Sequence, residues 1–341
     1  MSSKVRIGVL GASEIAFRRF VPAILRSDRF EFVGIAHVNE FEWCDNKRAD
    51  QSIITAEREK ANNFKKNFGG KIFESYNEMI YSDSIDAIYI PLPPALHFKW
   101  GEKALKAGKH ILLEKPFTTC LSDTRKLIKI AKRKKLAVHE NFAFAFHKQI
   151  DVISDLISKK EIGDVRLIKA SFGFPYRGEK DFRYKKSLGG GALLDCGGYP
   201  LKLASILLGE SGKVVCSQLS SAKEHDVDVY GSATLVNNDG LTAQISFGMD
   251  NAYRCELEIW GSDGFIIAPR VFTPPADMKP TIIVRKSDEK IIEVCEDDQF
   301  QHSAELFADC IENTEICIRN YNEISKQSKL FEDMKGRIYN A

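Results

Sequence analysis

The 341-residue sequence has no long apolar run, almost no net charge and no closely paired cysteines. No stretch approaches the roughly 18 consecutive apolar residues of a membrane-spanning helix, so a membrane protein is not expected. The 49 lysines and arginines nearly cancel the 47 aspartates and glutamates, which does not indicate a nucleic-acid-binding protein. The eight cysteines include no Cys-x-x-Cys pair, so we expect reduced thiols and no metal site. The first residues lack the apolar region of a secretion signal, and a cytoplasmic location is expected.

The length is about twice that of a typical domain, which predicts two domains. Residues 1–145 alternate β-branched runs with helical patterns. This strict alternation predicts an α/β Rossmann domain, in which a doubly wound parallel sheet lies between helices. The expected strands are 6–10, 30–36, 87–91, 110–113 and 137–140, the expected helices are 15–26, 97–107 and 122–134, and residues 39–59 are expected as a polar surface insertion.

Residues 146–341 change to a series of strands joined by tight turns such as Asn238-Asp239-Gly240. This pattern predicts an α+β domain built on a large, mainly antiparallel open sheet. The expected strands are 165–172, 214–219, 232–236, 241–247, 254–260, 265–268, 281–286 and 290–295, and the expected helices are 190–208, 299–312 and 321–335, the last two able to pack back on the first domain.

A glycine-rich segment follows the first predicted strand and opens the first predicted helix. Read against the dinucleotide fingerprint G-x-G-x-x-G/A, its positions are Gly11, Ser13 and Ala16, so the second glycine is replaced by serine. A helix N-terminus offers free N–H groups to a pyrophosphate. We expect Gly11, Ala12, Ser13, Glu14 and Ile15 to contact a dinucleotide cofactor; an ordinary tight turn is the alternative.

The end of the second predicted strand bears on the choice of nicotinamide cofactor. An acidic residue there would bind the adenosine ribose and repel a 2′-phosphate, but the run ends in Ala36-His37-Val38. His37, with Lys47 or Arg48, could face a 2′-phosphate, so NADP(H) is favoured. Glu40 lies close enough along the chain to keep NAD(H) open.

Ligands of open α/β sheets bind at the carboxyl ends of the strands, where two further segments lie. Pro91, Leu92 and His97 follow one strand, and Glu114 and Lys115 follow the next. We expect all five to lie at the cofactor. A lysine stationed there can donate to a substrate oxygen, although an ordinary surface lysine is the alternative.

A third motif, Gly189-Gly190-Gly191, precedes a predicted helix that carries Asp195 and Tyr199. Residues four apart share one face of a helix. A tyrosine hydroxyl has an ordinary pKa of about 10, so it relays protons efficiently near neutral pH only where a cation stabilises its anion. Lys115 could be that cation; a core aromatic residue is the alternative for Tyr199.

Together these motifs resemble the glucose-fructose oxidoreductase / inositol dehydrogenase / MocA family over nearly the whole chain. The resemblance implies a Rossmann domain followed by an open-sheet domain that carries the substrate site and dimer contacts. It also implies that Lys115 and residue 199 are catalytic, with Asp195 in support. Most members have histidine where this chain has Tyr199. Tyrosine at this position resembles three branches: glucose-fructose oxidoreductase itself, the dimeric dihydrodiol dehydrogenases and the nucleotide-sugar 3-ketoreductases. The segments 140–142, 172–175 and 182–183 resemble the last branch most.

The resulting hypothesis is NADPH-dependent reduction of a small keto-sugar, nucleotide-linked, by a homodimer or homotetramer. Tyr199 would donate the proton, Lys115 would stabilise the developing alkoxide, and Asp195 would orient Lys115 or a sugar hydroxyl. Two alternatives stay open: a dehydrogenase that oxidises a free sugar, polyol or cyclic diol, and a cofactor-binding regulator without catalysis. The other substrate contacts are expected to be Asn141 and, at a diphosphate linker, Arg177, Arg183 and Lys186.

Overall fold

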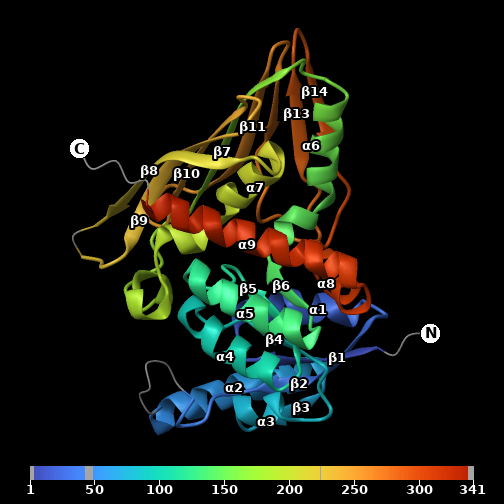
Figure 1. Cartoon of the computed structure of the whole chain (residues 1–341), viewed down its shortest axis with the longest axis vertical. Helices are drawn as coiled ribbons and strands as arrows, with labels where there is room; N and C mark the ends of the chain where they lie inside the picture. The colour runs from blue at the N-terminus through green and yellow to red at the C-terminus, as the bar shows by residue number, and fades with distance from the viewer. Residues whose placement is uncertain (1–3, 43–48, 223, 337–341) are drawn as a thin grey trace. The chain divides into compact units, whose positions relative to one another are not determined.

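The structure is a computed structural model that describes residues 4–42, 49–222 and 224–336. It divides into two compact units: residues 1–141 with 300–325, and residues 142–299 with 326–341. The first unit is built on a six-stranded parallel sheet in the order β3-β2-β1-β4-β5-β6 (Figure 1). Its strands are Val5–Leu10, Phe30–Ala36, Lys71–Phe73, Ala87–Ile90, His110–Glu114 and Val138–Asn141, numbered β1 to β6.

The sheet order confirms the doubly wound fold and locates its ligand edge. Strand β1 pairs in parallel with β2 on one side and with β4 on the other. The chain order therefore reverses between β1 and β4, and ligands bind outside the carboxyl ends of strands at such a point. Both β4 and β6 are buried along their whole length. β4 reads as an uninterrupted apolar run, whereas β6 carries the buried polar residues His139, Glu140 and Asn141.

Helices alternate with these strands as expected, with one difference in the predicted insertion. Residues 51–59 belong to a helix because Asp50 caps it: Asp50 Oδ1 accepts from the Ile53 N–H at 3.0 Å, and the buried Phe64 anchors the helix to the sheet. The short strand β3 and helix α3 were not predicted. The helices of this part are η1 Ala16–Phe20, α1 Val21–Leu25, α2 Gln51–Phe68, α3 Tyr76–Ile80, α4 Pro94–Lys106 and α5 Leu121–Lys134.

The C-terminal helices α8 (Gln299–Glu312) and α9 (Thr314–Gly336) follow the second unit in the chain. Residues 300–325 nevertheless group with the first unit. Arg29, just before β2, pairs with Asp309 at 2.5 Å and with Glu312 at 2.9 Å, which fastens α8 to the Rossmann layer. Helix α9 begins two turns earlier than predicted because Asn313 caps it, its Oδ1 accepting from the Glu315 N–H at 2.9 Å.

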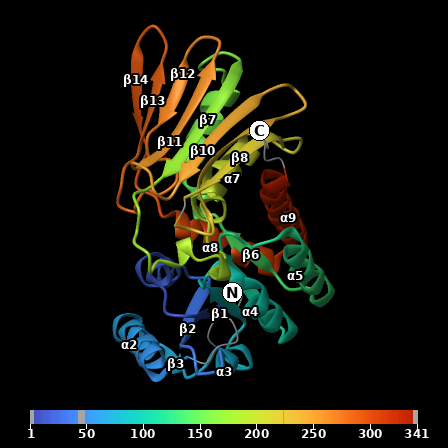
Figure 2. The same ribbon diagram turned by 90° about the vertical axis from the view of Figure 1, so that its left-hand side faces the viewer.

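The second unit holds an eight-stranded sheet in the order β14-β13-β12-β11-β7-β10-β9-β8 (Figure 2). All neighbours are antiparallel except β7 and β10, which run parallel, so the predicted mainly antiparallel sheet is confirmed. Its strands are β7 Val165–Gly173, β8 Lys213–Ser221, β9 Asp228–Val236, β10 Thr242–Gly248, β11 Arg254–Gly261, β12 Phe265–Ala268, β13 Thr281–Arg285 and β14 Glu289–Glu293.

One face of this sheet is apolar and buried, and the other face is open. Along β9, Val229, Ala233 and Leu235 are buried while Tyr230 and Ser232 are exposed. Helix α7 (Gly198–Leu208) packs on the buried face of β7 and β10, directly after the π-helical turn η6 (Leu193–Gly197). The helix α6 (Lys148–Ser158) was not predicted. Within the described ranges, no helix has the length and apolar character needed to cross a membrane.

Candidate active site

The phosphate loop closes tightly at the carboxyl end of β1. Gly11 has φ +102°, and its N–H donates to the Ala36 carbonyl at 3.0 Å. A Cβ at Gly11 would lie 2.6 Å from Leu92 Cδ2, so the absence of a side chain lets the β4 loop approach. Ser13 Oγ accepts from the Ala16 N–H at 3.2 Å, which caps the following helix. The strand, loop and capped helix fit the pyrophosphate of a dinucleotide.

The end of β2 differs from expectation. His37 is 2% exposed, with Nδ1 3.1 Å from the Val38 carbonyl oxygen and Nε2 3.3 Å from Glu74 Oε2. Glu74 also pairs with the exposed Arg58 at 3.1 Å. A buried imidazole beside a carboxylate is poorly placed to bind a 2′-phosphate, so the structure does not support the contact predicted for His37. Lys47 and Arg48 lie outside the described residues.

His97 also has a different position from the one expected. Its side chain is fully buried, with Nε2 2.7 Å from the Leu92 carbonyl oxygen and Nδ1 2.9 Å from the Pro116 carbonyl oxygen. Both ring nitrogens therefore face the protein backbone. His97 holds the loops that follow β4 and β5 and does not itself offer a surface to the cofactor.

Glu114 ends β5 and is held through one carboxylate oxygen. Glu114 Oε1 accepts from the Tyr89 hydroxyl at 2.5 Å and from Asn141 Nδ2 at 2.6 Å, while burial raises the pKa of Glu114. Asn141 Oδ1 in turn accepts from the Ser303 hydroxyl at 2.8 Å. Asn141, predicted to touch substrate, is only 4% exposed. One end of its amide donates to Glu114 and the other accepts from Ser303. The half-buried Lys115 follows directly.

In the second unit, Tyr199 is surrounded by phenylalanine rings. The centroid of its half-buried ring lies 4.9 Å from that of Phe172 and 5.7 Å from that of Phe144. Phe142 and Phe272 complete the cluster at 5.9 and 5.8 Å. These contacts fix the ring and keep water from its edges, which strengthens any charge interaction of the phenol oxygen.

Asp195, four residues before Tyr199, is paired with an arginine. Arg183 Nε donates to Asp195 Oδ2 at 2.8 Å, and Arg183 Nη1 donates to Asp181 at 3.1 Å. The three side chains are between 13% and 22% exposed. Arg183 was predicted to contact a diphosphate linker, but two of its nitrogens are engaged by carboxylates. We assign it instead to the orientation of Asp195.

The role of Arg183 in holding Asp195 can be tested with the variant Arg183→Gln. Removal of the guanidinium leaves two carboxylates without their cation, so we expect the free energy of unfolding to fall by roughly 1–3 kcal/mol. Turnover should fall about tenfold as Asp195 loses its orientation. Urea denaturation and steady-state kinetics measure both quantities, with Lys213→Gln, at an exposed lysine of β8 outside this loop, as the control. If stability and turnover are both unchanged in Arg183→Gln, Arg183 does not orient Asp195 for the reaction.

The three-glycine segment explains how this loop closes. The Gly191 N–H donates to the Arg183 carbonyl at 2.9 Å, and a Cβ at Gly190 would lie 2.3 Å from that carbonyl oxygen. Asp228, at the start of β9, accepts from the Leu193 N–H at 2.6 Å and caps the helix. A π-helical turn follows each glycine-rich segment, at Ala16–Phe20 and at Leu193–Gly197. Such turns are rare and often occur at functional sites.

The loop before that segment exposes an aromatic ring that sequence reasoning missed. Tyr176 is 41% exposed and lies against Tyr184 and His225, at centroid distances of 4.8 and 5.9 Å. The neighbouring Arg177 is exposed, with its guanidinium 4.4 Å from the Phe174 ring centroid. The adjacent Tyr176-Arg177 pair was the available signal, because base stacking and phosphate binding use these residue types together.

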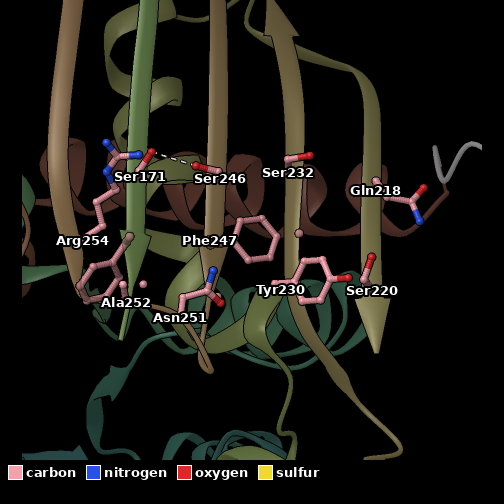
Figure 3. Close-up of a pocket in the computed structure, with 14 residues that line it drawn as sticks. Ser171, Gln218, Ser220, Tyr230, Ser232, Ser246, Phe247, Asn251, Ala252 and Arg254 are labelled. Carbon is pink, nitrogen blue, oxygen red and sulfur yellow. Dashed lines mark hydrogen bonds between the residues drawn. The ribbon is translucent and has the colours of Figure 1, made fainter. Parts of the chain in front are cut away.

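A hollow lies on the open face of the eight-stranded sheet. Serines from neighbouring strands line it in a row beside Tyr230 and Gln218 (Figure 3). Ser171 and Ser246 share a hydrogen bond of 2.8 Å between their hydroxyl oxygens. Among the described residues, no group of three or more His, Cys, Asp or Glu side chains is arranged to hold a metal ion.

A doubly wound sheet with a glycine loop at its switch point, followed by an open-sheet domain, defines a two-domain nicotinamide-dependent oxidoreductase. Residues 5–142 match the model of the oxidoreductase family with an NAD-binding Rossmann fold, and residues 150–267 match the GFO/IDH/MocA C-terminal domain. The chain therefore belongs to the GFO/IDH/MocA family and is an NAD(P)-dependent oxidoreductase. The predicted family and enzyme class are confirmed.

Similar proteins include two enzymes named dTDP-3,4-didehydro-2,6-dideoxy-α-D-glucose 3-reductase. The one from Actinomadura kijaniata is 36% identical over 91% of this chain and 88% of its own length. The one from Saccharopolyspora spinosa is 38% identical over 90% of this chain and 88% of its own length. A solved structure of KijD10, a 3-ketoreductase from A. kijaniata in complex with NADP and TDP-benzene, matches with a TM-score of 0.89, 34% identity and 98% coverage of both chains.

KijD10 has also been crystallised as a tyrosine-to-phenylalanine variant and as a lysine-to-alanine variant, each with TDP-benzene and NADP. The two substituted positions are 84 residues apart in that chain. Positions 115 and 199 of the present chain are also 84 residues apart.

Proposed function

We propose that this enzyme reduces the keto group of a nucleotide-linked deoxysugar, with Tyr199 as the proton donor and Lys115 as the group that stabilises the alkoxide. The observation that carries the proposal is the equal spacing of the lysine–tyrosine pair here and of the pair substituted in KijD10. The position of Lys115 directly after β5, at the ligand edge of the Rossmann sheet, supports it.

Bound NADPH would supply the hydride to the carbonyl carbon. Tyr199 would give its hydroxyl proton to the carbonyl oxygen as negative charge develops there. The Lys115 ammonium would donate a hydrogen bond to the same oxygen, which stabilises the alkoxide and lowers the cost of ionising the phenol. Asp195, oriented by Arg183, would bind a sugar hydroxyl or the lysine.

For the cofactor we propose NADP(H), held by Gly11, Ala12, Ser13, Glu14 and Ile15 at its phosphates and by Pro91, Leu92 and Glu114 nearer the nicotinamide. The absence of a carboxylate in the run Ala36-His37-Val38 supports the phosphorylated form. The complex of KijD10 with NADP supports it as well. Glu40, three residues beyond His37, is the group through which NAD(H) would be accepted instead.

For the substrate we propose that the loop 176–186 binds the nucleotide. Tyr176 offers an exposed aromatic surface on which a base can stack, and Arg177 and Lys186 are exposed cations of the same loop. The names of the two dTDP-sugar reductases and the TDP-benzene bound by KijD10 support a nucleoside diphosphate.

The nucleotide requirement separates this reductase from a dehydrogenase of free sugars, polyols or cyclic diols. NADPH oxidation, followed by nicotinamide absorbance, is expected with dTDP-keto-deoxysugars and not with the unlinked sugars. Tyr176→Ala should raise the KM for the nucleotide sugar about tenfold, in keeping with the loss of one base–aromatic contact, and leave kcat within about twofold. Turnover of free polyols at rates equal to those of nucleotide sugars would favour the dehydrogenase.

We also propose that two copies associate through the open sheet face. Trp260 of β11 is 54% exposed there, and Lys169 beside it pairs with Glu258 at 3.1 Å. Light scattering coupled to size exclusion is expected to give a mass of two or four chains. Trp260→Arg should lower that mass. Tyr81→Arg, at an aromatic residue of the first unit that is 63% exposed, should leave it unchanged. A wild-type mass of one chain would contradict the proposal.

A further inference from the structure

His97 lies between two loops that end at the ligand edge of the Rossmann sheet. It sits in the first turn of α4, and its ring faces the Leu92 carbonyl at 2.7 Å and the Pro116 carbonyl at 2.9 Å. Carbonyl oxygens only accept hydrogen bonds, so the ring must act as a donor. A neutral imidazole ties one of these carbonyls, and an imidazolium ties both. The fully buried ring therefore fixes backbone and binds no solvent.

The Pro116 contact holds the residue directly after Lys115. The next residue, Phe117, is held from the other side, because Glu140 Oε1 accepts from its N–H at 2.7 Å. Glu140 lies in β6 and is 6% exposed. The side chains of His97 and Glu140, which come from different elements, thus contact the backbone of two consecutive residues in the loop that begins with Lys115.

The contact between His97 and the Leu92 carbonyl links the same ring to the phosphate loop. The Leu92 side chain lies against Gly11, where a Cβ would be only 2.6 Å from Leu92 Cδ2. The imidazole of His97 therefore lies in contact with two loops at once, the loop after β5 and the loop after β4, which itself packs on the loop after β1. These are the three loops that surround a ligand at the switch point of the sheet.

We propose that His97 and Glu140 are positioning residues that set the Lys115 backbone relative to the cofactor-binding loops. The inference rests on the proposed role of Lys115 for its effect on turnover, but its effect on cofactor binding is independent of that role. A reacting group misplaced by about 1 Å can lose on the order of a hundredfold in rate.

The test compares His97→Leu, which removes every hydrogen-bond donor of the ring, with His97→Gln, which keeps an amide donor. We expect the Kd for NADPH, measured by fluorescence titration, to rise about tenfold for leucine and less for glutamine. We expect kcat with a keto-sugar nucleotide to fall about a hundredfold for leucine and less for glutamine. The KM for the sugar should stay within about twofold. Glu140→Ala should lower kcat, and Glu140→Gln, which keeps an acceptor for the Phe117 N–H, should recover most of the loss.

His110→Gln is the matched control. His110 lies at the other end of β5, where its Nδ1 accepts from the Ala137 N–H at 2.9 Å. We expect both His110→Gln and the His97 variants to lower the melting temperature. Unlike the His97 variants, His110→Gln should leave the Kd for NADPH and the kcat for the keto-sugar nucleotide unchanged. Equal Kd and kcat in wild type and both His97 variants would overturn the inference. If the wild type reduces no keto-sugar, the proposed function fails, and the Kd comparison still decides the role of His97.

Discussion

Tyr199→Phe is expected to lower kcat by about 10²–10⁴-fold, because the variant lacks the proton that the alkoxide needs. The phenyl ring keeps its contacts with Phe172 and Phe144, so the fold and the Kd for NADPH should stay unchanged. Stopped-flow measurement of hydride transfer, together with fluorescence titration of NADPH, measures both quantities. Tyr230→Phe, which removes a hydroxyl from the open sheet face, should behave as wild type.

A wild type that binds NADPH but turns over no keto-sugar or polyol would favour the remaining alternative, a cofactor-binding regulator. Retention of wild-type hydride transfer by Tyr199→Phe would instead show that another group, or water, supplies the proton.

Gly11→Ala is expected to raise the Kd for NADPH by at least about tenfold. Two effects act together: the φ of +102° is strained for a residue with a Cβ, and that Cβ would lie 2.6 Å from Leu92 Cδ2 and 3.3 Å from the Tyr76 hydroxyl. The loop must move, and the phosphate cradle moves with it. The measurement is a fluorescence titration with NADPH, accompanied by thermal unfolding without cofactor.

Gly240→Ala is the control for backbone strain alone. Gly240 has φ +84° in the turn between β9 and β10, where an added Cβ meets no atom within 4 Å. It should lower stability and leave the Kd for NADPH unchanged. If Gly11→Ala binds NADPH as tightly as wild type, cofactor binding does not depend on the tight conformation of the loop after β1.

Most strands of the first unit could be predicted because their signals are local. The strands β1, β2, β4 and β5 each carry their own apolar run, and strict alternation with helices predicts a doubly wound parallel sheet. The helix α6 was missed, although Ile150, Ile153 and Leu156 have helical spacing and are buried. Strand β3 has only three residues, Lys71–Phe73, which is too short for a pattern.

The site residues were found by motif, but their partners could not be, because the partners lie far away in the chain. Asn141 is bonded to Ser303, 162 positions away, and both ring nitrogens of His97 face backbone carbonyls that no side-chain pattern reveals. Glu74, which follows the unpredicted strand β3, likewise places a carboxylate beside the buried His37. The spacing of the motifs identified the region of the site. The packing in the structure shows that several of the predicted residues hold other site residues in place and do not offer a surface to a ligand.

The most direct test of the shared role of Lys115 and Tyr199 is a double-mutant cycle on the rate of hydride transfer to a dTDP-keto-deoxysugar. Lys115→Ala and Tyr199→Phe should each lower the rate by on the order of a hundredfold or more. Because both groups serve one oxygen, the double variant should be at most about tenfold slower than the slower single variant. If the two losses multiply in the double variant, Lys115 and Tyr199 act independently, and the proposed mechanism is contradicted.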